Sequence, residues 1–574
     1  MLGEKMSKDR KNSIKRYSVL LFIFIILSIL FILPLFKWHY LPFGDDMDFN
    51  VDRVLELKYN FLHFNFYPQL STYTFRSLAY PLNVFYPWYT LIPFAFFEMI
   101  IPNHMWGFVI GFAFYAFVGL TISYVVVKKI TNNEVQSFFA SVCYIFSEYL
   151  SIDAFRRFDL GEFVGMIIMP IAFYGFYDVL FKGENKKSWV ILGLGMSLLV
   201  LTHMLSTLIV SMCLFVLFFI FFKKVENKKM VFLNLLKSIL ICIGASAIFL
   251  FPFIYQNIVQ YFGTKTTTIS QSFYPQGFGT LIMSSLNSEC QNFQYGIGVC
   301  GILILILGLI YFKKLSNLSK VLYIAGSITF FMSSTAFPWY LLDNTIISII
   351  QFPYRLLMLT SMFYAFVGGE IIAKAIANYT NDSQHSKMFI SACFLIGLIV
   401  PQIGQTQLML QNTDSFRNGY GELKKDTGVY KKFTSFQLET YTPQNEQGAC
   451  SNVYDHVAII DGNSTKLSTK NIKSEPNSIV YTSKLVKDSH DVVLPILYYK
   501  DMFKAERNGK AATVYCSENG QLAVKSSNLG PIKISYKYNF ASILGIICSL
   551  VCWVLGLILL FGNNKLGRVK NEEE

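Results

Sequence analysis

The chain has 574 residues, of which 53% are hydrophobic, 17% aromatic and only 15% charged, and its formal net charge is +13. Its mean hydropathy is +0.43. Soluble domains carry roughly 25% charged residues, so the composition excludes a water-soluble enzyme, a disordered chain and a fibrous protein. A basic soluble protein would suggest a nucleic-acid partner. Here the lysines gather at the ends of apolar runs, where they contact membrane lipids, so we expect no nucleic acid.

Apolar runs of about 20 residues follow one another along the chain, which is typical of a polytopic α-helical membrane protein. A basic stretch precedes Tyr17–Phe36, and this run is too long for a signal peptide, so it predicts a first span with its N-terminus inside. The pair Lys128-Lys129 marks the inner end of Met105–Val127. We therefore expect the proline-containing stretch Val84–Ile101 to lie at the outer interface.

These lysine positions predict about 12 spans in the plasma membrane, with the N- and C-termini cytoplasmic. The expected helical domain covers residues 1–404, including a first outer loop at 37–104, and the last helix and cytoplasmic tail cover 539–574. The predicted spans are Tyr17–Phe36, Met105–Val127, Val135–Leu150, Phe163–Leu180, Trp189–His203, Leu205–Phe222, Met230–Tyr255, Tyr295–Phe312, Val321–Thr335, Leu356–Ile376, Met388–Ile403 and Phe540–Phe561.

A polar segment at residues 405–538 separates the last two predicted spans, and it is too long for a loop without structure. Apolar and polar residues alternate over Ile532–Tyr536, and Val492–Tyr499 is a second strand candidate. Asn519-Gly520 is a hairpin signal because both residues tolerate positive φ. We expect a small extracellular β-sandwich here, with no catalytic residue.

The cysteines and short motifs indicate no metal-binding or nucleotide-binding site. Cys450 and Cys516 fall in the polar segment and are candidates for a disulfide, and Cys290 and Cys300 form a weaker candidate pair. We find no zinc-type spacing, no Walker loop and no GxGxxG motif.

Three aspartates, Asp45, Asp46 and Asp48, follow the first span on the expected outer side. Carboxylates this close repel one another, so one pKa should rise toward that of a useful general base, unless a divalent cation sits among them. The alternative is a solvated turn or a cap for the helix predicted at Val51–Leu57. The candidate catalytic base is Asp46, or else Asp45 or Asp48.

A second group of charges lies on the outer side between the third and fourth spans. Asp153 and Arg157 are four residues apart, and Asp159 and Glu162 are three apart, so each pair can share a helix face. One interpretation is a set of ion pairs at the level of the lipid headgroups. The other is a pocket in which Arg157 binds a phosphate and the carboxylates orient a sugar. Ionisable residues near the membrane favour the second interpretation.

Two further outer residues are candidates for substrate binding. Arg355 follows Phe352-Pro353 at a helix start, where a cation opposes the helix dipole and an anionic ligand would relieve it. The alternative for Arg355 is snorkelling to lipid phosphates. His203 lies at the outer end of the fifth span; a lone histidine of this kind is more often a satisfied core residue than a catalyst.

Taken in chain order, these features resemble a known family. They are the acidic motif, a Tyr-Pro-rich interfacial helix, Arg157-Phe158-Asp159-Leu160-Gly161-Glu162, Leu201-Thr202-His203 and Phe352-Pro353-Tyr354-Arg355. Over nearly the whole chain the sequence resembles the bacterial integral membrane proteins labelled 6-pyruvoyl-tetrahydropterin synthase-related, which are similar to the C-type (GT-C) glycosyltransferase superfamily. Gly44-Asp45-Asp46 through Arg53 matches the first-loop motif of the family, with Asn50 where many relatives have histidine.

The resemblance implies an all-α, GT-C-like membrane fold and an active-site aspartate in the first outer loop. It also implies a polyprenyl-phosphate-linked sugar donor and an envelope glycan or lipid acceptor on the outer face, with inversion at the anomeric carbon. The residues that it implies for substrate binding are Arg53, Arg157, Asp159, Glu162, His203 and Arg355.

Two other functions stay open at this point. One is a transporter or flippase of lipid-linked envelope intermediates, and the other is a non-catalytic assembly protein whose β domain binds a partner. A transporter predicts charges deep in the spans and inverted repeats. We find few such charges and no convincing internal repeat.

Overall fold

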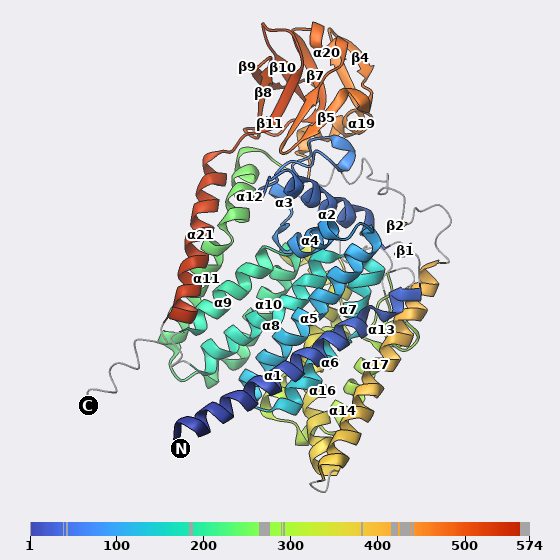
Figure 1. Cartoon of the computed structure of the whole chain (residues 1–574), viewed down its shortest axis with the longest axis vertical. Helices are drawn as coiled ribbons and strands as arrows, with labels where there is room; N and C mark the ends of the chain where they lie inside the picture. The colour runs from blue at the N-terminus through green and yellow to red at the C-terminus, as the bar shows by residue number, and fades with distance from the viewer. Residues whose placement is uncertain are drawn as a thin grey trace, which may run out of the picture.

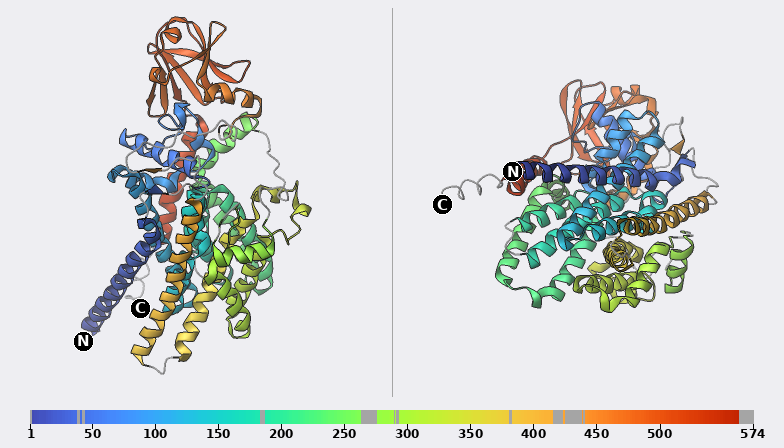
Figure 2. Two further views of the ribbon diagram at one scale, coloured as in Figure 1. Left: turned by 90° about the vertical axis from the view of Figure 1, so that its right-hand side faces the viewer. Right: turned by 60° about the horizontal axis from the view of Figure 1, so that its bottom comes forward.

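The computed structural model describes residues 2–37, 40–41, 44–182, 187–262, 276–288, 290, 293–379, 383–414, 423–424, 438 and 441–562. A body of long helices carries a β-rich domain, here called the β domain (residues 441–538), at one end (Figure 1). Helix α1 begins and helix α21 ends at the opposite end of the body (Figure 1). A second view shows the same order, with α1 tilted away from the other helices (Figure 2).

The principal helices of the body follow one another in the order of the chain. They are α1 (Leu2–Ile32), α2 (Met47–Leu62), α3 (Leu82–Phe85), α4 (Ile92–Ile100), α5 (His104–Thr131), α6 (Glu134–Ile145), α7 (Glu148–Ser151), α8 (Leu160–Phe181), α9 (Ser188–Val200), α10 (Met204–Phe221), α11 (Lys228–Ala245), α12 (Ala247–Val259), α13 (Phe278–Asn287), α14 (Gly298–Ile310), α15 (Asn317–Met332), α16 (Leu357–Tyr379), α17 (Gln384–Asp414) and α21 (Phe540–Phe561).

Capping residues explain where several of these helices start and stop. The side chains of Asn103 and Asn133 accept the backbone N–H groups that begin α5 and α6. Asn132 ends α5 with a left-handed φ of 54°, which asparagine tolerates better than most residues. The turn between α5 and α6 is therefore tight, and it follows Lys128-Lys129 as the sequence led us to expect.

Within the described residues, seven helices are long and apolar enough to cross a membrane, or up to nine if each of two bent pairs is one span. The bent pairs are α6 with residues 148–157, at 44°, and α11 with α12, at 79°. The predicted spans Trp189–His203, Tyr295–Phe312 and Val321–Thr335 correspond to the shorter helices α9, α14 and α15. A polytopic helical protein is confirmed, whereas the count of about 12 spans stays a prediction.

The apolar stretch Val84–Ile101 forms only short helices, of which α4 has nine residues and is too short to span. This agrees with the expectation that the stretch does not cross the membrane, whereas its place at the outer interface stays a prediction. One expected domain boundary differs in the structure. Helix α17 continues to Asp414, so the expected domain boundary at residue 404 falls inside it. The helix continues eleven residues past Ile403, the end of the predicted apolar run, and Gln405 in this extension donates a hydrogen bond to the Ser285 carbonyl.

The β domain is one continuous antiparallel sheet of nine strands, in the order β4-β3-β7-β10-β9-β8-β11-β6-β5. Strand β9 pairs with both β8 and β10, so the expected β-sandwich of two separate sheets is wrong in this detail. The Asn519-Gly520 turn joins β9 to β10 as predicted, and Gly520 has a φ of +86°. The strands are β3 (Val457–Ile460), β4 (Asn463–Lys466), β5 (Ile472–Glu475), β6 (Ser478–Tyr481), β7 (Asp491–Leu497), β8 (Phe503–Arg507), β9 (Lys510–Cys516), β10 (Gln521–Lys525) and β11 (Ile532–Tyr536).

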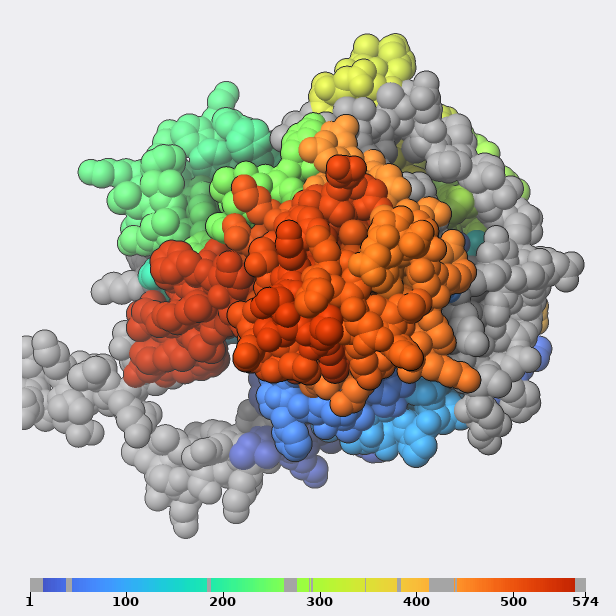
Figure 3. Space-filling model, turned by 90° about the horizontal axis from the view of Figure 1, so that it is seen from above, coloured from blue at the N-terminus to red at the C-terminus, as the bar shows by residue number. Residues whose placement is uncertain are grey.

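The first loop and the β domain share one hydrophobic core. Leu70, Tyr80 and Phe85 of the loop pack in a single buried cluster with apolar strand residues of the domain. The loop is held in turn to α2, because the Glu56 carboxylate accepts the backbone N–H groups of Thr72, Tyr73 and Thr74 at 2.7–3.0 Å. Seen from above, the domain covers the centre of this face and the first-loop region emerges beside it (Figure 3).

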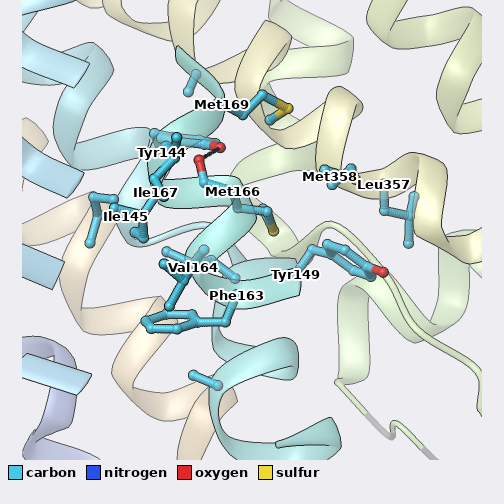
Figure 4. Packing of buried hydrophobic residues seen from close by; sticks show 14 of the residues in the cluster. Tyr144, Ile145, Tyr149, Phe163, Val164, Met166, Ile167, Met169, Leu357 and Met358 are labelled. Carbon is cyan, nitrogen blue, oxygen red and sulfur yellow. Dashed lines mark hydrogen bonds between the residues drawn. The ribbon is translucent and has the colours of Figure 1, made fainter. Parts of the chain in front are cut away.

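Helix α8 lies in the middle of the apolar core of the body. Phe163, Met166 and Met169 pack between α6–α7 and α16, and the Tyr144 hydroxyl donates to the Met166 carbonyl at 2.7 Å (Figure 4). The rigid core thus fixes the start of α8, where Asp159 and Glu162 lie.

None of the ten cysteines forms a disulfide in the structure, so neither candidate pair is bonded. Cys450 is buried beside the Thr442 hydroxyl, whereas Cys516 is exposed at the end of β9. Cys290 and Cys300 also stay unbonded to each other.

Candidate functional site

The motifs predicted to matter come together at the end of the body that carries the β domain. We call this group the polar cluster; it consists of Asp45, Asp46, Arg53, Asp153, Arg156, Arg157, Asp159, Glu162, His203 and Arg355. Its members come from the start of α2, the π-helical turn η4 (Ile152–Arg157), the starts of α8 and α10, and the 3-10 turn η10 (Pro353–Leu356).

Two backbone hydrogen bonds fasten the first loop to η4. The N–H groups of Asp45 and Asp46 donate to the carbonyls of Arg156 and Arg157 at 3.2 and 2.8 Å. Gly44 is required at this approach, because a Cβ there would lie 2.7 Å from the Phe158 Cβ. The acidic motif is therefore placed beside the second group of charges by the backbone itself.

Asp45 is committed to structural contacts. Its two carboxylate oxygens accept from the Arg156 guanidinium and from the Tyr295 hydroxyl. These contacts join the first loop, η4 and the segment before α14. A carboxylate satisfied on both oxygens is a poor general base, so the structure favours Asp46 over Asp45.

Arg157 is the centre of a buried ion cluster. It contacts the carboxylates of Asp153, Asp159 and Glu162, with N–O distances of 3.0 Å to Asp159 and 2.9 Å to Glu162. Its guanidinium also lies 5.2 Å from the centre of the Tyr354 ring. With three carboxylates around one guanidinium, Arg157 is already compensated, and its first effect is to hold these acids in place.

Arg355 brings a motif nearly 200 residues away in sequence to the same cluster. Its Nε lies 3.3 Å from Glu162 Oε2, and it donates to the carbonyl of Ile350 at 3.1 Å and to Gln351 Oε1 at 2.8 Å. The side chain is about 10% exposed, so it keeps some access to the site. Arg355 is thus anchored by one carboxylate and two neutral acceptors.

Asp46 is the accessible acid of the cluster. It precedes α2 at the N-cap position, within an exposed turn, but its side chain makes no capping hydrogen bond. Its side chain is solvent-exposed while protein groups surround it. Desolvation by the surrounding protein is the main cause that raises the pKa of Asp46 to about 7, and the negative charges of Asp159 and Asp45 add to it. The positive charges of Arg157 and Arg355 act in the opposite direction. Such a carboxyl can take up a proton near neutral pH.

Asp159 and His203 form the wall beside Asp46. Burial alone would raise the pKa of Asp159, but the charges of Arg157, His203 and Arg355 lower it to about 2, so it is a permanent anion. His203 begins α10, where its Nδ1 lies 2.8 Å from the Ser206 hydroxyl. Burial lowers the pKa of His203. The ring approaches α8 closely at Gly161, where a Cβ would lie 3.1 Å from His203 Cδ2.

Arg53 and Asn50 are buried on the inner face of α2. Asn50 donates to the carbonyls of Asp46 and Phe158 and accepts from Arg53, so it ties α2 to the end of η4. Arg53 donates to the Pro87 carbonyl and lies 4.1 Å from the centre of the Tyr86 ring. The asparagine in place of histidine therefore has a positioning role in this chain.

Asp48 is directed elsewhere. Its charge acts on Asp52, one turn further along α2, and it is only half-buried. Of the three predicted aspartates, Asp45 and Asp46 make the contacts that define the polar cluster.

Four tyrosines that were not singled out from the sequence line the polar cluster. Tyr86 and Tyr354 fall inside quoted motifs and could have been weighed there, whereas Tyr295 and Tyr441 lie in segments without any signal. Tyr295 packs edge-to-face on Tyr354, with ring centres 4.8 Å apart, and Tyr441 reaches Tyr86 from the β domain. An aromatic wall next to carboxylates suits a sugar, which has apolar faces and hydroxyl edges.

A resident metal ion finds little support. In the part of the chain that the structure describes, no group of three or more His, Cys, Asp or Glu side chains is arranged to hold one. The reason is local: arginines occupy the carboxylates, with Arg156 on Asp45 and Arg157 on Asp153, Asp159 and Glu162. A divalent cation among the three aspartates was one alternative from the sequence; in the structure Asp45 is paired with Arg156.

No family model matches the chain, and no comparison with known proteins supports the pterin-synthase-related label. An uncharacterized protein of Lactococcus lactis subsp. cremoris (strain MG1363) is 22% identical over 279 residues, which are 47% of this chain and 44% of that protein. The chain thus spans less than half of the length of this relative.

Three solved structures align with the chain at 11–13% sequence identity. The oligosaccharyltransferase of Archaeoglobus fulgidus in its apo form has a TM-score of 0.40 at 13% identity, over 68% of this chain and 55% of that chain. ArnT from Cupriavidus metallidurans, bound to undecaprenyl phosphate, has a TM-score of 0.37 at 11% identity, over 69% and 75%. AglB from Archaeoglobus fulgidus, in complex with an inhibitory peptide and a dolichol-phosphate, has a TM-score of 0.35 at 12% identity, over 70% and 56%.

Proposed function

We propose that this protein is a membrane glycosyltransferase that transfers a sugar from a polyprenyl-phosphate donor to an envelope glycan or lipid on the outer face of the plasma membrane. Likeness to solved structures at this distance does not carry the proposal. The observation that carries it is the juxtaposition of Asp46, an accessible carboxyl with a pKa of about 7, with Arg355 at the end of an apolar groove.

The groove has a volume of about 440 Å³ and is bounded almost entirely by apolar side chains of α10, α15 and α16. Ile350 and Leu356 belong to its lining, and Arg355 donates a hydrogen bond to the Ile350 carbonyl. A cation beside the end of an apolar groove suits a lipid with a phosphate head, because the tail leaves water while the phosphate gains a charged donor. We assign the polyprenyl chain to the groove and its phosphate to Arg355.

In the proposed reaction, an acceptor hydroxyl attacks the anomeric carbon of the donor sugar. Asp46 takes the hydroxyl proton as the new C–O bond forms, and the bond to the donor phosphate breaks with inversion. Arg355 stabilises the charge that develops on the leaving phosphate. Arg157 acts indirectly by fixing Asp159 and Glu162, which, with His203, are proposed to orient the sugar.

This mechanism places the β domain and the polar cluster outside the cell and both termini in the cytoplasm, since α1 begins and α21 ends at the opposite end of the body (Figure 1). The lysines that close α5 and α10 are consistent with this orientation. A tag beside residue 46 that reacts with a membrane-impermeant reagent in intact cells would support it, and reaction only after lysis would exclude it.

The direct test is replacement of Asp46 by Asn in the purified protein, with Asp48→Asn as the matched control in the same motif. Transfer of labelled sugar from a polyprenyl-phosphate donor should fall about 100-fold or more in Asp46→Asn and stay near the wild-type rate in Asp48→Asn. Equal activity of the two variants would contradict the assignment of the base. Movement of the donor across a liposome membrane without sugar transfer would favour the transporter instead.

A further inference from the structure

Arg53 differs from the other buried arginines of the described residues in how its charge is compensated. Arg157 and Arg355 both contact the Glu162 carboxylate. Arg507, in the β domain, contacts no described carboxylate but donates four hydrogen bonds to backbone carbonyl oxygens. For Arg53, no described carboxylate oxygen lies within 4.0 Å, and only two acceptors receive its hydrogen bonds.

The guanidinium of Arg53 therefore has unused donors. Its two hydrogen bonds go to Asn50 Oδ1 and the Pro87 carbonyl, and its Nε is buried without an acceptor. A guanidinium carries more N–H donors than these bonds use. Arg53 is only 2% exposed, and burial lowers its pKa against the opposing effects of Tyr86, Tyr441 and Asp159. A buried cation in this state is costly, and an anion would offset the cost.

Two tyrosine side chains lie near this guanidinium. The centre of the Tyr86 ring lies 4.1 Å from Arg53 Cζ. The Tyr441 ring packs edge-to-face against the Tyr86 ring, with ring centres 6.3 Å apart. Both side chains are only half-buried, and within the described residues neither hydroxyl takes part in a hydrogen bond. Donors that are free in the protein are available to a ligand.

The β domain fixes the position of Tyr441. Its ring stacks on Phe85 with centres 6.0 Å apart, and its carbonyl accepts the Tyr499 hydroxyl at 2.9 Å. Phe85 belongs to the hydrophobic core that the first loop and the β domain share. The site is thus incomplete without the β domain, although the sequence suggested no chemical role for that domain.

We propose that Arg53, Tyr86 and Tyr441 form an oxyanion-binding subsite, completed by the β domain, that takes a phosphate or carboxylate of one of the two substrates. A planar guanidinium with unused N–H donors, next to two tyrosines whose hydroxyls make no described hydrogen bond, supplies the kind of donors that such a group requires. The inference rests on the proposed transferase function for the choice of substrates. The oxyanion belongs either to the donor lipid phosphate or to an anionic acceptor.

The test measures binding without turnover, using the full-length protein in lipid nanodiscs. The probes are undecaprenyl phosphate, undecaprenol as the same lipid without phosphate, and glycerol 3-phosphate as a soluble oxyanion. Arg53→Gln should weaken binding of a phosphate-bearing probe about 10-fold or more, and Tyr441→Phe about threefold. Undecaprenol binding should not change. A loss with undecaprenyl phosphate assigns the oxyanion to the donor, and a loss with glycerol 3-phosphate alone assigns it to the acceptor.

The chain offers a matched control in Arg76 and Tyr454, an arginine of the first loop 4.3 Å from the ring centre of a β-domain tyrosine. Arg76→Gln and Tyr454→Phe should leave both phosphate probes bound as in the wild type. Unchanged affinities in Arg53→Gln and Tyr441→Phe, or equal losses in the controls, would overturn the subsite. Tyr441→Phe keeps the ring packing, so it remains informative if Arg53→Gln does not fold. A wild-type protein without transfer activity, but with these binding losses, would refute the transferase and retain the subsite.

Discussion

Arg355 Nε lies 3.3 Å from Glu162 Oε2, and this contact joins the Phe-Pro-Tyr-Arg motif before α16 to the acidic motif that begins α8. Glu162 also contacts Arg157 at 2.9 Å and accepts the Tyr149 hydroxyl at 2.7 Å. One carboxylate therefore sets the positions of two arginines whose surroundings differ. Arg157 is compensated by three acids, whereas Arg355 has one and adjoins the apolar groove.

The two arginines should respond differently to removal of their charge. Arg157→Gln leaves the buried Asp153 and Asp159 carboxylates without their arginine, and leaves Glu162 with Arg355 alone, so it should cost about 3–5 kcal/mol of stability. Arg355→Gln should fold, because Glu162 keeps Arg157, but it should weaken binding of a polyprenyl phosphate by about 10-fold or more. Thermal unfolding in detergent and lipid-binding titrations separate the two effects. Equal stability of both variants would contradict the division of roles.

The pH dependence of transfer follows from Asp46. A general base works in its deprotonated form, so the rate should rise with pH and reach half of its maximum near the Asp46 pKa of about 7. Asp159→Asn removes a negative charge that raises this pKa, so the midpoint should move to lower pH. Rate profiles of wild type and variant provide the measurement. A midpoint that stays in place, or moves upward, is incompatible with Asp46 as the titrating base.

Filling the apolar groove should block the donor without disturbing the polar cluster. Ala325 lies in the groove lining on α15, and Ala325→Phe would take up part of the space of about 440 Å³. We expect a raised KM for the polyprenyl donor, with an unchanged KM for the acceptor. Ala377→Phe, near the end of α16, is the matched control because Ala377 lines a different pocket. A donor KM that rises equally in both variants would remove the groove from the donor path.

The sequence predicted local structure correctly where a residue type has one dominant structural role. Lysine pairs at helix ends and the Asn519-Gly520 hairpin predicted local features that the structure has, because membrane topology and positive φ constrain residue choice directly. Asp46, Arg157 and Arg355, which were grouped from sidedness and the family resemblance, lie in one cluster in the structure, whereas their roles stay predictions.

What failed were predictions that depend on packing. From the sequence, Asp45 and Asp46 are equivalent candidates for the base, but in the structure both Asp45 carboxylate oxygens accept hydrogen bonds, from Arg156 and Tyr295. Arg157 was a candidate for binding a phosphate, but in the structure three carboxylates contact its guanidinium. Tyr441 could not be singled out, because tyrosine is abundant in this chain and the contact with Tyr86 joins residues far apart in sequence. The number of spans could not be predicted for a similar reason. Helices as short as α9 and α14 are stabilised by packing against their neighbours rather than by their own length.

Asp52 supplies a prediction about stability that is independent of catalysis. It is 7% exposed on α2, and burial raises its pKa from 3.8 to about 8, with Glu56 and Asp48 adding to the effect and the Phe75 backbone N–H opposing it. A carboxyl with a raised folded-state pKa binds its proton more tightly when folded. Its contribution to stability is therefore fully present below pH 3.8 and is lost as pH rises through about 8.

Asp52→Asn removes this titration and keeps an oxygen that can accept from Phe75. The variant should unfold at a higher temperature than the wild type above pH 8, and the difference should disappear in acid, where Asp52 is neutral in both the folded and unfolded states. Asp48→Asn, whose side chain is less buried, is the control and should give a smaller change. Melting temperatures measured across this pH range decide the matter: a stabilisation that is constant with pH, or that grows in acid, would show that Asp52 is not a buried carboxyl with a raised pKa.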